Sequence, residues 1–372
     1  MSQTPPRHAI LGVAIGSPSA HPDIHPTVET YRERMQLAER ALLDFVFLHD
    51  ARSFDGHARL DALSVLSRLA PETRHIGLAV SKPTTYTEPF TVSRELSTLD
   101  FVSQGRAAWN ATGSGSAAEA QNFGRAQAPD AIELRSVAEE FVEVSRKLWD
   151  SWEDDAVITD RERGHYLDAA RLHHINHVGQ HFRIRGPAIT YRPPQGHVVV
   201  VQVDTGDLGT PLTPEIADVL ALHIPDPEDA RDTRERLRAR VAGIGRDPDS
   251  LKVLLNLQPI LGSTEASARE RAAELDAAWH LLHDATLEPP AARFVGTSEQ
   301  LADHVQAALE RGAADGFLLL PASLPDDLQR IHDGLVPALQ RRGLFRTAYT
   351  GQTLREHLRL PRPVSQFAQA AD

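Results

Sequence analysis

The 372-residue sequence contains no cysteine, which excludes disulfides, thiolate metal sites and cysteine nucleophiles. It also lacks a basic run long enough to form a nucleic-acid-binding face, and its formal net charge is -12 with acids and bases interspersed. No apolar segment approaches the roughly 20 residues that a membrane-spanning helix needs. We therefore expect no nucleic-acid partner, no membrane insertion and a cytoplasmic location.

Several catalytic motifs are also missing. There is no G-x-G-x-x-G after the first apolar run, no G-x-S-x-G nucleophile elbow, and no pair of carboxylates spaced for glycoside hydrolysis. Apolar residues still make up 41% of the chain, enough for a sizeable core. The sequence thus predicts a large globular domain whose chemistry does not depend on these motifs.

What is present is an alternation of short apolar runs with longer helical patterns. Continuous apolar strands separated by helices indicate a parallel sheet covered on both faces. Eight such units and this length favour a single closed (β/α)8 TIM barrel, with an open doubly wound sheet as the alternative. The eight predicted strands begin at Ala9, Asp44, His75, Arg106, His197, Asp218, Leu251 and Gly316.

Capping patterns and turn residues refine this organisation. Thr27 is expected to cap the first long helix, and Ser298 to open a capping box before another. An inserted hairpin region that ends at a Pro-Pro turn is expected between strands four and five. We expect one domain over residues 1–363 and a flexible tail over 364–372.

In a barrel of this kind ligands bind at the carboxyl ends of the strands. The stretch "RAAWNATG" brings Trp109 and Asn110 to such an end, and other strands end near His49, Ser81 and Asn256. This set is polar and carries few charges. A site of this composition, with an indole in it, suits a flat hydrogen-bonding organic ligand better than a metal ion.

Several motifs in order resemble one family. "SRELSTLDFVSQGRAAWNATGSGSAAEAQNFG", "TTYTEPF", "LWDSWEDDAV", "HVGQHFRIRGPA" and "LQRRGLFRTAYTGQTLREHLRLPRP" are similar to segments of luciferase-like flavin-dependent monooxygenases. The branch is that of nitrilotriacetate, EDTA and dibenzothiophene-sulfone monooxygenases. The resemblance implies a TIM barrel and a two-component enzyme. Such an enzyme takes reduced FMN as a cosubstrate from an NAD(P)H:flavin reductase and uses oxygen to oxidise a small organic substrate; a homodimer or homotetramer is expected.

The resemblance also implies site residues. Asp50, Ser81 and Asn110 match positions near the flavin, and His49 is a candidate catalytic residue beside them. Three of them also have a plainer interpretation: a helix cap for Asp50, a satisfied core amide for Asn110, and a partly buried, hydrogen-bonded histidine for His49.

Other positions depart from the family pattern around the flavin phosphate. Ala131 and Arg135 replace a His and a Tyr, although Arg135 can meet a phosphate as a cation. Thr205 and Gly206 can form a backbone cradle, but Asp204 places a negative charge beside it. The segment covering the active site is also shortened and is expected to run almost directly from helix to helix. These departures predict weak FMN binding, and the alternative is a non-catalytic or weakly flavin-binding homologue acting as a binding or partner subunit.

The run "HHINHVGQH" suggests a metal site at first sight. His173, His174, His177 and His181 have the residue type that zinc prefers. The family shares part of this pattern without being metal-dependent, so the resemblance implies no metal here.

Overall fold

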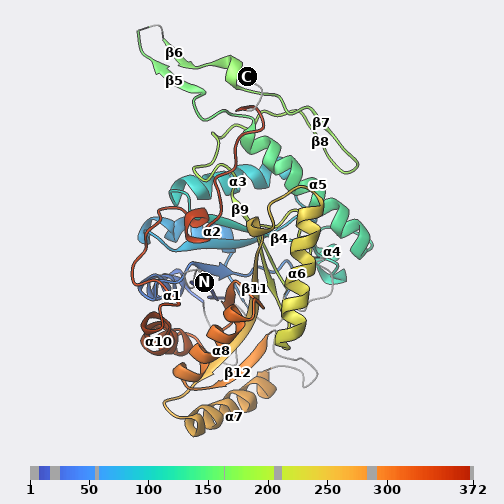
Figure 1. Ribbon diagram of the computed structural model, residues 1–372. Helices are drawn as coiled ribbons and strands as arrows, with labels where there is room; N and C mark the ends of the chain where they lie inside the picture. The colour runs from blue at the N-terminus through green and yellow to red at the C-terminus, as the bar shows by residue number, and fades with distance from the viewer. Residues whose placement is uncertain are drawn as a thin grey trace.

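The computed structural model describes residues 8–16, 26–54, 58–162, 164–204, 212–282 and 291–368. Eight parallel strands form a closed barrel in the order β10-β9-β4-β3-β2-β1-β13-β11, and the β10–β11 pairing closes the ring (Figure 1). The predicted (β/α)8 barrel is therefore confirmed. Its strands are β1 (Ile10–Ala14), β2 (Phe45–Leu48), β3 (Gly77–Pro83), β4 (Ala107–Thr112), β9 (Val199–Val203), β10 (Val219–Leu222), β11 (Lys252–Leu261) and β13 (Gly316–Leu319).

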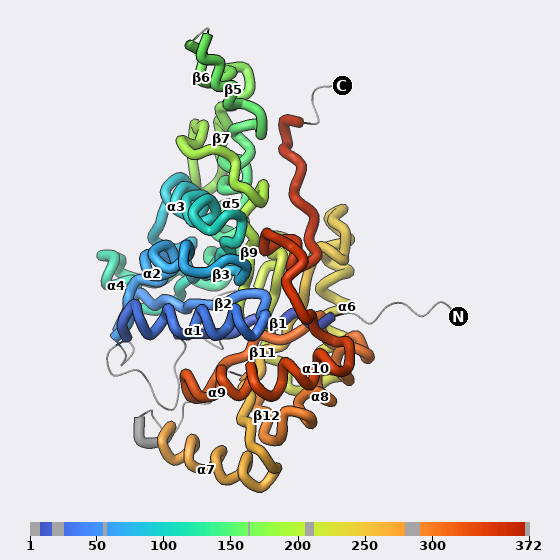
Figure 2. The backbone as a smooth tube through the Cα atoms, turned by 90° about the vertical axis from the view of Figure 1, so that its left-hand side faces the viewer, coloured from blue at the N-terminus to red at the C-terminus, as the bar shows by residue number. Residues whose placement is uncertain are grey.

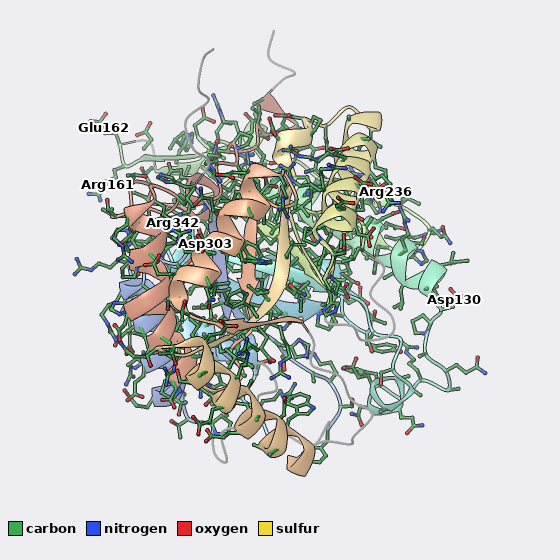
Figure 3. The ribbon with its side chains drawn as sticks, turned by 60° about the horizontal axis from the view of Figure 1, so that its bottom comes forward. Asp130, Arg161, Glu162, Arg236, Asp303 and Arg342 are labelled. Carbon is green, nitrogen blue, oxygen red and sulfur yellow. The ribbon has the colours of Figure 1, made fainter. Side chains whose placement is uncertain are left out.

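Helices surround this barrel. Within the described ranges, no helix is both long and apolar enough to cross a bilayer. In Figure 3, Asp303 of α8 and Arg342 just after α10 lie near each other, and they pair at 2.6 Å. The helices are α1 (Val28–Arg40), α2 (Ala62–Leu69), α3 (Pro89–Val102), α4 (Ala117–Asn122), α5 (Ala131–Asp150), α6 (Pro227–Gly243), α7 (Glu265–Leu282), α8 (Ser298–Glu310), α9 (Asp326–Arg330), α10 (Val336–Arg341) and α11 (Leu354–His357).

Strand alternation divides the apolar core into two layers. Phe47, Ala79 and Ala108 belong to the cluster inside the barrel, whereas their strand neighbours belong to the layer under the helices. Gly12 marks how tightly the inside is filled, because a Cβ there would lie 2.3 Å from the ring of Phe45. The barrel is thus a packed core, and ligands are left to its ends.

Two local expectations need correction. Thr297, not Ser298, caps α8: its side chain accepts from the backbone of Gln300, which returns the bond in a capping box. The chain between α7 and α8 also does not pass directly from helix to helix, because β12 (Ala292–Gly296) pairs with the second half of β11. The Thr27 cap of α1 is confirmed.

An arm projects from the barrel between β4 and β9. It carries two antiparallel hairpins, β5 (Val157–Asp160) with β6 (His165–Leu167) and β7 (His177–Val178) with β8 (Arg183–Ile184). The second hairpin confirms the predicted insertion; the first was not predicted. Figure 2 shows the C-terminal segment rising alongside this arm.

Contacts tie that segment to the arm. The ring of Phe367 stacks on His173 at 3.8 Å, and the backbone N–H of Gln366 donates to Asp150. Residues 369–372 lie outside the described residues, and the domain boundary at 363 stays a prediction.

At the amino end of the barrel, three strands are preceded by a buried aspartate that exchanges two hydrogen bonds with the neighbouring strand. The backbone N–H of Asp218 donates to the carbonyl of Val200, and the N–H of Val200 donates back to the Asp218 carboxylate at 2.9 Å. Asp44 makes the same exchange with Leu11, and Asp315 makes it with Val253.

Each of these carboxylates also meets an arginine from a distant segment. Arg234 of α6 forms a two-point pair with Asp315 at 2.6 and 3.2 Å. Arg355 of α11 pairs with Asp218 at 3.1 Å, and Arg346 pairs with Asp44. Two leucines of the same C-terminal region, Leu354 and Leu358, pack among the barrel-interior residues. The C-terminal region thus fills the amino end of the barrel with Leu354 and Leu358 and is held there by ion pairs.

Candidate functional site

The carboxyl end of the barrel is lined by neutral polar side chains. Ser81 and Asn110 follow Ala79 and Ala108 on the inward face of β3 and β4, and both are at most 1% exposed. The Asn110 amide donates to the Ser81 hydroxyl at 2.9 Å, and its carbonyl oxygen accepts from the backbone of Val203 at 3.1 Å. The two predicted residues therefore form one bonded pair across neighbouring strands.

This pair keeps hydrogen-bonding capacity for a ligand. The amide nitrogen of Asn110 carries a second hydrogen, and the Ser81 hydroxyl still has its own hydrogen to donate. Asn256 of β11 lies on the same inward face, where its Nδ2 donates to the carbonyl of Asp204 at 2.6 Å. Its Oδ1 is buried and accepts no hydrogen bond from the described residues. The mouth thus offers donors on one side and an acceptor on the other.

His49 and Asp50 directly follow β2. The ring of His49 lies 6.3 Å from that of Phe47, continuing the inward alternation of the strand. Burial raises the pKa of Asp50, while the Arg52 guanidinium, 3.8 Å away, opposes that rise. This places a histidine and a carboxyl of altered basicity at one edge of the mouth.

The loops after β2, β3 and β4 are joined at the rim. Glu119 and Asn122 of α4 bond to the backbone of Arg52 at 3.0 and 2.7 Å. Tyr86 has a φ of 61° and stacks on Phe123 at 5.1 Å, and its hydroxyl makes no hydrogen bond within the described residues. Strained residues of this kind cluster at functional sites.

Sequence reasoning did not single out Tyr86 or Phe123 as site residues. Their signal was already present in the segments "TTYTEPF" and "AQNFG", one after β3 and the other within and after α4. The structure brings the two segments together as an aromatic stack. The two motifs thus meet at one wall of the mouth.

The expected indole is not in the site. Trp109 points away from the barrel interior, where its ring packs 5.6 Å from Phe141 of α5 and its N–H donates to the carbonyl of Lys82 at 2.7 Å. It is fully buried in the layer under the helices. Because strand residues alternate, Asn110 faces the mouth and its neighbour cannot.

The residues expected near a phosphate are engaged elsewhere or lie outside the described residues. Arg135 donates to Glu139 at 2.8 Å and to Glu215 at 3.4 Å, and these carboxylates compete with any anionic ligand. The Asp204 carboxylate accepts from the backbone of His223 at 3.4 Å. Thr205 and Gly206 lie outside the described residues, so their predicted role stays a prediction.

The four histidines of the arm meet four different partners. His177 bonds to Glu140 at 3.0 Å and His173 to Glu153 at 2.7 Å. His174 bonds to a backbone carbonyl and His181 to Ser136. In the ranges that the structure describes, no group of three or more such side chains is arranged to hold a metal ion.

Comparison with known proteins identifies similar chains. The family model of luciferase-like monooxygenases matches residues 11–317. Nitrilotriacetate monooxygenase component A of Aminobacter aminovorans is 33% identical, with 97% of this chain and 96% of that protein covered. Dibenzothiophene-sulfone monooxygenase of Rhodococcus erythropolis is 31% identical, with 90% of each covered.

Solved structures agree. The crystal structure of a long-chain alkane monooxygenase superposes with a TM-score of 0.86 at 26% identity, and all of both chains is covered. The family predicted from the sequence motifs is confirmed, and with it the prediction of a flavin-dependent oxidoreductase.

Proposed function

Because the chain belongs to the luciferase-like monooxygenase family, we propose that it is the oxygenase of a two-component system that uses reduced FMN and oxygen to oxidise a small organic substrate. The observation that carries this proposal is the Ser81–Asn110 pair, buried at the carboxyl end of the barrel with donors to spare. A relative named as component A of a monooxygenase supports a separate flavin reductase as partner.

The donor set fits the ring of a flavin. The pyrimidine edge of isoalloxazine presents carbonyl oxygens, which need hydrogen-bond donors. Ser81 and Asn110 supply these donors from the buried end of the barrel. Bound reduced flavin supplies two electrons, so that one oxygen atom enters the substrate and the other leaves as water.

The protein's own groups position and shield the reaction. His49 is proposed to hold or transfer a proton at the mouth, since one nitrogen of an imidazole ring can accept a proton and the other can donate one. Asp50 is proposed to bond the flavin, and Tyr86 with Phe123 to exclude water from one side. Thr205 and Gly206 are proposed to meet the phosphate.

Weak binding of the phosphate is part of this proposal. Arg135 is held by two carboxylates, and Asp204 adds a negative charge where β9 ends. Most of the affinity then comes from the ring, so riboflavin, which lacks the phosphate, should bind almost as well as FMN. We expect the two dissociation constants to agree within about fivefold.

Anaerobic titration with reduced FMN and reduced riboflavin tests both the proposed oxygenase function and the weak binding of the phosphate. The matched variant is Asn110→Leu, which removes the amide and is expected to abolish saturation by either flavin. If wild-type protein does not saturate with flavin up to millimolar concentration, the proposed oxygenase is wrong. A non-catalytic partner subunit, the alternative expected from the sequence, then becomes the better explanation. The oligomeric state, proposed as a homodimer or homotetramer, follows from light scattering.

A further inference from the structure

The barrel wall opens on one side near its carboxyl end. The β10–β11 ladder has its last pair at Leu222 and Leu255, and β11 turns to β12 from Leu257 onward. A pocket of about 430 Å³ lies at this divergence, between the end of β10, the middle of β11, the start of β12 and α8. Its volume falls in the range of small-molecule sites, roughly 300–1,000 Å³.

The pocket is mainly apolar and aromatic. The rings of Phe294 and Phe317 lie 5.8 and 5.9 Å from the ring of His304, and all three line it. Burial lowers the pKa of His304, which favours the neutral form of this ring. Arg293 also lines the pocket, but its guanidinium is engaged by Asp276 at 2.6 Å. Such walls favour an uncharged ring over an ionic ligand.

Two residues connect the pocket with the barrel mouth. Ala291 lines it and also packs in the barrel-interior cluster with Val203 and Leu320. Asn256 lines it too, and the buried Oδ1 of its side chain accepts no hydrogen bond from the described residues. An unsatisfied buried acceptor is unfavourable unless a ligand completes it. The unsatisfied oxygen of Asn256 therefore marks the position to which a ligand would donate a hydrogen bond.

We propose that this side pocket binds an uncharged, ring-bearing part of the organic substrate, whose N–H or O–H group donates to Asn256 Oδ1. The proposal rests on the proposed oxygenase function, because the substrate's reacting atom would then extend into the mouth beside Ser81 and Asn110. It names the substrate class: neutral, apolar, ring-containing, with one hydrogen-bond donor.

Indole is the probe, since it is an uncharged bicyclic ring with a single N–H. Benzofuran is its matched control, because it has the same shape and no donor. Isothermal titration of the full-length protein should show saturable indole binding and at least threefold weaker benzofuran binding. Asn256→Ala should remove this preference. Equal affinities for the two ligands in wild-type protein would overturn the role of Asn256.

Two variants test the location. Ala308→Leu on α8 fills the pocket and should weaken indole binding at least tenfold. Ala307→Leu on the same helix, outside the lining, should change it less than twofold. Phe294→Leu removes a ring from the pocket without adding volume and should also weaken indole binding. This second variant keeps the location testable if Ala308→Leu does not fold. Equal effects of the two alanine replacements would disprove the pocket.

Flavin titration of the same variants separates this proposal from the oxygenase function. Ala308→Leu should keep the wild-type flavin affinity while losing indole. Saturable indole binding in a protein that binds no flavin would overturn the oxygenase and keep the pocket. Flavin binding without saturable indole binding would overturn the pocket and keep the oxygenase function.

Discussion

The two ends of the barrel handle buried polarity in opposite ways. At the amino end, Asp44, Asp218 and Asp315 each bond to a neighbouring strand and pair with an arginine. At the carboxyl end, Ser81 and Asn110 are neutral and keep donors to spare. The aspartates at the amino end are bonded within the fold, whereas Ser81 and Asn110 at the carboxyl end still have hydrogens to donate to a ligand. Substitutions at the two ends should therefore have separable effects.

The largest expected effect is at the amino end. Asp315→Ala leaves the Arg234 guanidinium buried without its carboxylate, and the free energy of unfolding should fall by about 3–5 kcal/mol. Urea unfolding followed by circular dichroism measures it. The double variant Arg234→Met/Asp315→Ala should be clearly more stable than the single one. Equal losses would show that the unpaired charge is not the cause.

Asp100, in the last turn of α3, gives the second effect, which depends on pH. Burial raises its pKa to about 6, against the bonds donated by Gln195 and Ala107. Between pH 4 and 6 the folded state holds a proton that the unfolded chain has released. The stabilisation is thus complete below pH 3.8 and is lost as pH rises through 6, by up to about 3 kcal/mol.

Comparison with Asp100→Asn separates the pH-dependent contribution of Asp100 to stability from that of all other carboxyl groups. The stability difference between wild type and variant should shift in favour of the variant from pH 4 to pH 7. A difference that stays constant over this range would contradict the raised pKa of Asp100.

A substitution at the carboxyl end should affect binding more than folding. Asn110→Ala leaves the N–H of Val203 without its acceptor, so stability should fall by about 1–3 kcal/mol. Reduced-flavin affinity should fall at least tenfold, measured by anaerobic fluorescence titration. Asp315→Ala, assayed where it remains folded, should bind flavin like wild type. If both variants lost flavin binding equally, the two ends would not be functionally distinct.

The charge of Asp204 gives a smaller effect at the same end. Asp204→Asn keeps an acceptor for His223 and removes the negative charge, so FMN should bind about three- to tenfold more tightly. Riboflavin affinity should not change, because it has no phosphate. Raising the salt concentration should shrink the gain. A gain that is the same for both flavins would place Asp204 away from the phosphate.

The smallest effect concerns the arm, away from both ends. Glu140 accepts from His177, His181 and Phe182, and these bonds lower its pKa to about 2. Its contribution is therefore present above pH 4.5 and is lost as pH falls toward 2. Glu140→Gln should cost about 1 kcal/mol. Hydrogen exchange should speed up at the amides of His181 and Phe182 and remain unchanged in β3 and β4.

The barrel was predictable because its strands are continuous apolar runs and its helices carry readable caps such as Thr27. β12 was missed because "ARFVG" is short and only its last residue, Gly296, is buried. The inward or outward direction of Trp109 was missed because both faces of a barrel strand are apolar. Hydrophobicity cannot then tell the two faces apart.

The site was predictable only in part. Ser81 and Asn110 were found through strand ends and family motifs, and the structure joins them directly. The amino-end pairs were not found, because Asp44 and Arg346 are separated by 302 positions and the motif that contains Arg346 does not indicate its partner. The unsatisfied oxygen of Asn256 was not visible either, since it depends on which neighbours fail to reach it.

The ion pairs that Arg346 and Arg355 form at the amino end of the barrel have a consequence for biosynthesis. Their partners Asp44 and Asp218 leave the ribosome long before them, and chain growth proceeds at about 5–20 residues per second. The last barrel strand, β13, ends at Leu319, so for about 1–7 s a nascent barrel holds these carboxylates without their cations and lacks the leucines of α11. Truncation just before residue 346 should leave a nascent chain that chaperones retain.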